Sequence, residues 1–136
     1  MENPLTVAKK KATQAGWDKI VVLVTCPNAE MAGELARALV DSQLAACVNV
    51  LASPVGSIYR WKGKMEHAPE HLLIVKTAHR LLPQLESLIK RRHSYKVPEI
   101  IALPIIGGSF KYLKWVEEVL LSSKSKKAGK AAGKKK

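Results

Sequence analysis

Apolar positions change their spacing several times along the chain, and the order of these changes predicts strands and helices. A near-continuous apolar run at residues 20–25 is typical of a central β-strand. Asn28 is a favourable N-cap for a helix. The apolar stripe of that helix consists of Ala32, Leu35, Ala36, Leu39 and Val40. A second helix is predicted at residues 80–93, a further strand at residues 99–103, and a last helix after Ser109.

Between the first two helices, residues 45–78 predict a long β-hairpin with its turn at residues 61–64. Its first segment, residues 46–61, could extend about 50 Å, although Pro54 and Gly56 should bend it. A domain of this size is only about 30 Å across. The hairpin should therefore project beyond its own sheet, and its exposed edges need a partner, for which a second copy of the chain is the simplest candidate.

The order of elements is β-α-β-β-α-β with an added C-terminal helix, which predicts an α+β, ferredoxin-like sandwich. Two right-handed crossovers place both main helices on one face of an antiparallel sheet. In the return strand of the hairpin, Leu72 and Ile74 share one face and Leu73 lies on the other, so we expect this strand to be buried on both sides. The sheet face without helices gives a second reason to expect self-association.

Length and composition agree with one domain, because 136 residues with 47% apolar side chains can form a single core. We expect a disordered basic leader at residues 1–18, a folded domain at residues 19–121 and a disordered Lys-rich tail at residues 122–136. The tail holds seven lysines and no acid, and it contributes much of the net charge of +12. The charge therefore belongs to the tails more than to the fold.

The cysteines indicate a reducing compartment. Cys26 and Cys47 form neither a CxxC motif nor part of a dense disulfide framework. No apolar stretch approaches the roughly 18 residues of a membrane span, and no apolar run follows the lysines near the start of the chain. We expect a cytoplasmic protein with no membrane span.

Several short strings occur in a characteristic order and spacing. They are TCPN at 25–28, LAACVN at 44–49, SIYRW at 57–61, KT at 76–77 and HSYKVPEIIALP at 93–104. Together they resemble the CutA family of divalent-cation tolerance proteins, and the similarity covers about residues 20–120. The resemblance implies a ferredoxin-like homotrimer whose long hairpins build the subunit interfaces. It also implies a role in the tolerance of copper and other divalent metals.

The resemblance identifies Cys47 as a candidate copper ligand. A soft thiolate favours Cu(I), and imidazole can serve as a second ligand, which makes His93 the candidate companion. The alternative is that Cys47, which lies among Ala and Val, packs as a small buried hydrophobe. Copper or another divalent metal is therefore a candidate ligand of the protein, and none is obligatory.

A second candidate site combines aromatic side chains with hydrogen-bond donors and one acid. It consists of Tyr59, Arg60, Trp61, Lys76, Tyr95 and Glu99. In the family such residues gather near a cleft between subunits, and analogy with nitrogen-regulatory signalling trimers suggests a small anionic ligand there. Lys62 and Lys96 stand where the family usually has an acid, which favours an anion over a cation. The alternative is that the aromatic residues only anchor the trimer interface.

Two other function classes are compatible with this topology. An RNA-binding module would need aromatic residues in its central strands, and residues 20–25 and 72–77 contain none. The Lys-rich tail could bind nucleic acid or anionic lipid without sequence specificity. An acyl-phosphate hydrolase would need a Gly-rich loop after the first strand, and residues 25–29 contain no glycine. We therefore expect no enzyme and no specific nucleic-acid partner.

Overall fold

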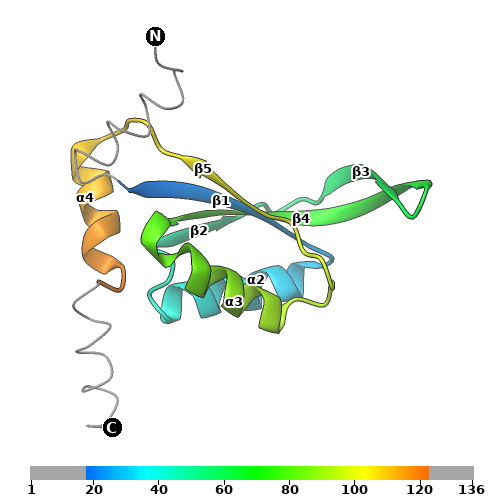
Figure 1. Cartoon of the computed structure of the whole chain (residues 1–136), viewed down its shortest axis with the longest axis horizontal. Helices are drawn as coiled ribbons and strands as arrows, with labels where there is room; N and C mark the ends of the chain where they lie inside the picture. The colour runs from blue at the N-terminus through cyan, green and yellow to red at the C-terminus, as the bar shows by residue number, and fades with distance from the viewer. Residues whose placement is uncertain (1–17, 123–136) are drawn as a thin grey trace, which may run out of the picture.

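One antiparallel sheet, covered on one face by two helices, makes up the body of the protein (Figure 1). The computed structural model describes residues 18–122. The strands are β1 (Lys19–Cys26), β2 (Cys47–Val50), β3 (Val55–Trp61), β4 (Lys64–Ala78) and β5 (Ile100–Pro104), and the helices are α2 (Ala29–Asp41), α3 (Leu82–Arg92) and α4 (Phe110–Val119). The strand order is β2-β4-β1-β5, with β3 paired to β4 alone. This confirms the predicted ferredoxin-like α+β fold. Most of the predicted leader and tail lies outside the described residues.

The first helix, α2, begins as its sequence predicts. The side-chain Oδ1 of Asn28 accepts a hydrogen bond from the backbone N–H of Met31 at 2.8 Å, which satisfies one of the free donors at the helix start. Ala32, Leu35, Ala36 and Leu39 are buried against the sheet. Val40, the last member of the predicted stripe, is instead exposed at the outer edge of the helix.

The second helical segment starts with a tighter turn than predicted. Residues His79–Leu81 form a 3₁₀ turn and α3 follows directly, with Pro83 in its first turn, where a missing N–H costs no helical hydrogen bond. The backbone N–H of His79 donates to Asp18 O at 2.7 Å. This bond ties the turn to the start of β1.

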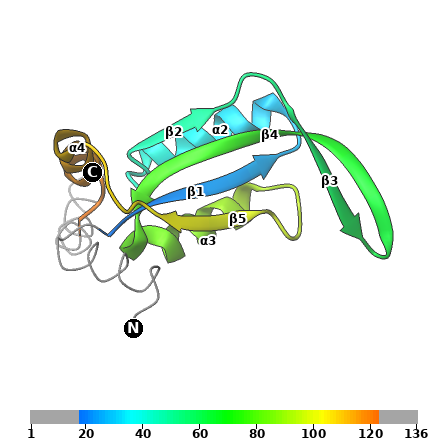
Figure 2. The ribbon, with the colours of Figure 1, turned by 90° about the horizontal axis from the view of Figure 1, so that it is seen from above.

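The hairpin projects from the sheet as predicted (Figures 1 and 2). Its first segment is interrupted at residues 51–54, which include the predicted bend at Pro54. At the tip, Lys62 and Gly63 have φ angles of 49° and 78°, which is the left-handed pair that a tight two-residue hairpin turn requires. We call residues 55–70, in which β3 pairs only with the outer part of β4, the arm.

The two faces of the sheet differ in their cover. Val22, Val24, Leu73 and Val75 point to the helices and are fully buried. The other side, which we call the open face, carries two cross-strand rows, Cys47–Lys76–Val21–Leu103 and Asn49–Ile74–Leu23–Ile101. The prediction that β4 is buried on both sides is therefore wrong for the single chain. Leu72 and Ile74 are only partly buried because no helix covers their face.

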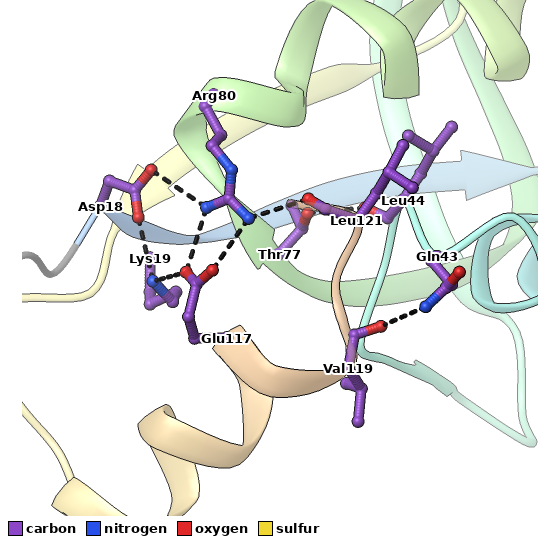
Figure 3. A network of polar contacts seen from close by, with 9 residues as sticks. All are labelled: Asp18, Lys19, Gln43, Leu44, Thr77, Arg80, Glu117, Val119 and Leu121. Atoms are coloured by element: carbon purple, nitrogen blue, oxygen red, sulfur yellow. Dashed lines mark hydrogen bonds and ion pairs between the residues drawn. The ribbon is translucent and has the colours of Figure 1, made fainter. Parts of the chain in front are cut away.

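A network of charged groups attaches α4 to the end of the sheet (Figure 3). Lys19 Nζ donates to Glu117 Oε1 at 2.7 Å and to Asp18 Oδ1 at 2.9 Å. The guanidinium of Arg80 bonds to both carboxylate oxygens of Glu117, at 3.0 and 2.9 Å, and to Leu121 O at 2.9 Å. The side chain of Lys19 is only 3% exposed, so its charge depends on these two acids for compensation.

Replacing Glu117 tests this network. In Glu117→Gln the buried ammonium of Lys19 loses the closer of its two anionic partners, and we expect the free energy of unfolding to fall by about 1–2 kcal/mol. The measurement is urea denaturation at fixed protein concentration. Glu118→Gln is the matched control, because Glu118 is exposed on the same helix and forms no ion pair within residues 18–122. Equal losses in the two variants would contradict the assigned role of Glu117.

The same network predicts how stability depends on pH. Burial would raise the pKa of Glu117, but hydrogen bonds from Lys19 and Arg80 outweigh it and hold the pKa below 4.5. Burial would also raise the pKa of Asp18, but the hydrogen bond from Lys19 outweighs this effect. The pKa of Asp18 therefore lies below its ordinary value of 3.8. The unfolded chain therefore takes up protons first on acidification. The stability that these two acids contribute should be complete above these ordinary values, decline as the pH falls below them, and be lost as the pH passes through the lowered folded-state pKa values. Urea midpoints of Glu117→Gln measured across this range should fall less steeply than those of the wild type.

Candidate functional site

A cleft of about 770 Å³ opens where the arm leaves the sheet. It is lined by Thr25, Ser57, Ile58, Tyr59, Arg60, Trp61, Glu70, Tyr95, Lys96, Val97, Pro98 and Glu99. One wall is β3, and the other is the loop between α3 and β5. Thr25 of β1 and Glu70 of β4 come from the adjoining strands. The cleft therefore brings together segments that are far apart in the sequence.

His93 holds the loop wall in place. Its Nε2–H donates to the backbone carbonyl of Thr25 at 2.7 Å, and its Nδ1 accepts from the backbone N–H of Tyr95 at 3.0 Å. A carbonyl can only accept, so the ring proton is on Nε2. The rings of His93 and Tyr95 also lie 4.8 Å apart, centroid to centroid. The buried imidazole thus fixes Tyr95 over the end of β1.

Carboxylates without countercharges mark one end of the cleft. Glu70 is only 7% exposed. Burial, a hydrogen bond with Glu70 and the charge of Glu70 raise the pKa of Tyr95 to about 12. Burial and the charge of Glu70 also raise the pKa of Glu99. Within residues 18–122 neither Glu70 nor Glu99 forms an ion pair. This end of the cleft is therefore at negative potential.

The two basic residues of the cleft do not offset this potential. Arg60 Nη1 donates to Gly63 O at 3.4 Å, at the hairpin turn. Lys96 is exposed to solvent. Neither cation is among the groups that shift the pKa of Glu99 or of Tyr95. The cleft consequently has one buried carboxylate, Glu70, while Glu99 and both cations are exposed to solvent.

Most of the predicted cleft residues meet in this cleft. Tyr59, Arg60, Trp61, Tyr95 and Glu99 all line it. Lys76 does not, because it lies toward the other end of β4, opposite Cys47 and Val21, where its Nζ donates to Asn49 Oδ1. Sequence reasoning missed Glu70. The available signal was strand alternation, which places the acid Glu70 on the same face as the apolar Leu72 and Ile74. A carboxylate is rarely found at a buried position unless it has a partner or a function.

The two predicted metal ligands lie apart. Cys47 pairs with Lys76, which pairs with Val21, whereas His93 bonds to Thr25, four residues further along β1. Four strand residues span about 13 Å, so one ion cannot bridge the two side chains within a single chain. Both ring nitrogens of His93 are also engaged in hydrogen bonds. Among residues 18–122 no group of three or more His, Cys, Asp or Glu side chains converges.

The two thiols differ in how they can react. Cys26 is fully buried, and burial together with the charge of Glu70 raises its pKa to about 11. It therefore stays protonated and packs as a small apolar residue. Cys47 is only partly buried and lies beside Tyr112 of α4, whose pKa is raised by burial and by this cysteine. Of the two, Cys47 is the thiol that an ion could reach.

Comparison with known proteins agrees with the fold and the sequence strings. The sequence model of the CutA1 divalent ion tolerance proteins matches residues 20–119. Human protein CutA is 49% identical over 96 residues, which is 71% of this chain and 53% of that protein. Divalent-cation tolerance protein CutA of Thermus thermophilus is 48% identical over 98 residues, 72% of this chain and 94% of that protein. The chain thus spans about half of the human relative and nearly all of the bacterial one.

Solved structures show the same arrangement. CutA1 from Oryza sativa superposes with a TM-score of 0.75 and 46% identity, covering 77% of this chain and 95% of that one. The relatives differ in cellular location, since the rice and Arabidopsis proteins are chloroplastic and the protein from Archaeoglobus fulgidus is described as periplasmic. The predicted cytoplasmic location therefore stays a prediction. Within residues 18–122 no helix is long and apolar enough to cross a membrane.

The family model covers the sheet, both covering helices and α4, and the identity to several relatives approaches one half over that same region. The predicted resemblance is thereby confirmed, and the chain belongs to the CutA1 family of divalent ion tolerance proteins.

Proposed function

We propose that the chain acts in divalent-cation tolerance as a homotrimer whose clefts bind a small ligand. The observation that carries this proposal is the position of the cleft. One of its walls is β3, the strand that pairs only with the outer part of β4. A two-stranded arm is marginally stable by itself, so a binding site on the arm would be held in place better when further copies of the chain contact it.

The arm supports self-association on energetic grounds. Every residue from 58 to 67 is exposed, including Ile58 at 70% and Met65 at 74%. An isolated two-stranded ribbon is marginally stable in water and offers unpaired backbone groups along β3. Contact with further copies of the chain would cover these apolar side chains.

The open face adds a second surface. Ile101 and Leu103 of β5 are about half exposed, beside the partly buried Val21 and Leu23 of β1. A continuous apolar surface on a folded chain marks a place of association. Together the arm and the open face leave one side of the single chain without cover.

Copper binding through Cys47 is a second candidate function. The observation that favours it is the contrast between the two thiols, because Cys26 is buried with a raised pKa and Cys47 is partly exposed. A thiolate at Cys47 would favour Cu(I). His93 would not be its companion within one chain, since its imidazole closes the loop over β1.

The assembly can be tested by measuring mass in solution at micromolar concentration. We expect about three times the chain mass of 14.9 kDa. Ile101→Lys should shift the mass toward the single chain, because a charge would be buried on the open face. Val40→Lys is the matched control, since Val40 is 44% exposed on the helix side of the molecule and Ile101 is 50% exposed. A wild-type monomer would contradict the proposal.

The copper site can be tested by competition titration with Cu(I) under reducing conditions. We expect Cys47→Ala to lose high-affinity binding, because it removes the accessible thiol. Cys26→Ala should bind as the wild type does, since the thiol of Cys26 is fully buried. If Cys47→Ala retained the affinity of the wild type, Cys47 would not be a ligand.

A further inference from the structure

We propose that the cleft recognises an organic ammonium cation, held by the carboxylates of Glu70 and Glu99 and by the aromatic rings of Tyr59, Trp61 and Tyr95. This inference rests on the proposed ligand-binding role of the same cleft and names the class of ligand. It differs from the anionic ligand that Lys62 and Lys96 led us to expect from the sequence.

The first step concerns charge. Glu70 lines the cleft, is more than nine-tenths buried, and has no ion pair within residues 18–122. A buried carboxylate is costly unless a cation or several donors compensate it. The hydroxyl of Tyr95 donates a hydrogen bond to this carboxylate. Glu99 lies close enough for the charge of Glu70 to disfavour its ionisation. A cation between the two would relieve both.

The second step concerns the aromatic residues. Tyr59 and Trp61 occur at alternate positions of β3, and Tyr95 faces them from the loop wall of the same cleft. Tyr59 and Trp61 are about half exposed although both are large. Aromatic faces attract organic cations, by about 0.5–2 kcal/mol each, and a set of such rings with carboxylates is the usual cage for an ammonium group.

A bare metal ion fits these residues less well. Divalent magnesium and calcium require about six or more oxygen ligands, and the two carboxylates supply few of them. No third His, Cys, Asp or Glu completes a ligand group among the described residues. A volume of about 770 Å³ is also that of a site for a small molecule and not for a single ion.

An anion is disfavoured by the placement of the cations. Lys96 is exposed and the guanidinium of Arg60 bonds to Gly63 O, at the hairpin turn. An anion in contact with either would meet the negative potential of Glu70 and Glu99. A cationic ligand with a polar end can instead place its charge at the carboxylates and its polar group toward Lys96.

Isothermal titration of the full chain with choline, with its uncharged isostere 3,3-dimethyl-1-butanol and with putrescine tests the proposal. Choline or putrescine should bind, and the isostere should bind at least about ten-fold more weakly than choline, because it has the same shape without the charge. Binding that is equal for choline and the isostere would overturn the proposal, since the carboxylates would then play no part.

Variants locate the binding. Glu70→Gln keeps the shape and an acceptor for Tyr95, and we expect it to weaken amine binding by about ten-fold. Glu99→Gln should weaken binding in the same direction. Glu66→Gln is the matched control, because Glu66 is exposed on the same strand and does not line the cleft. Amine binding that Glu70→Gln and Glu99→Gln leave unchanged would overturn the proposal.

Succinate and inorganic phosphate separate this inference from the proposed function. If either anion bound and Lys96→Gln abolished its binding while the amines did not bind, the ammonium proposal would fail and the cleft would remain a ligand site. If no probe bound and the mass in solution were also that of one chain, the proposed function would fail as well.

Discussion

The backbone register of β4 is the constraint on which the rest of the structure depends. Residues 71–78 of this strand pair with β1, and residues 64–70 pair with β3. One continuous strand therefore builds the centre of the sheet and then leaves it to form the arm. Glu70 is the last residue on the arm side of this change of partner, where it pairs with Val55, and the next residue, His71, pairs with Cys26 of β1. The buried carboxylate owes its place in the cleft to this change of partner.

The acidic residues at the two ends of the sheet have pKa values that are shifted in opposite directions. At the end covered by α4, Lys19 and Arg80 bond to Glu117 and lower its pKa despite partial burial. At the end where the arm leaves, no cation within residues 18–122 forms an ion pair with Glu70, and the pKa of Glu99 is raised. Paired charges at the first end attach a helix, which serves stability. Uncompensated charges at the second end cost stability and are typical of sites that bind something.

The sequence was sufficient for features that depend on neighbours along the chain. The cap at Asn28, the last helix after Ser109 and the bend near Pro54 were all predicted correctly. The roles of Glu70 and His93 depend instead on contacts between residues far apart in sequence, such as the bond from His93 to Thr25. Lys76 shows the same limit. Strand alternation places it on a face, but only the register shows that this position is distant from the loop that forms the cleft.

In the proposed trimer, assembly and occupancy of the cleft would be physically linked, because β3 would take part in both. The same strand is the exposed edge of the arm and one wall of the cleft. Interactions that hold β3 in position for a partner chain would also hold Tyr59 and Trp61 in position for a ligand, so part of the ordering cost would be shared. Coupling of this kind is reciprocal in free energy. A ligand that bridges β3 and the loop carrying Tyr95 would therefore favour the assembled arm by the same factor by which assembly favours the ligand.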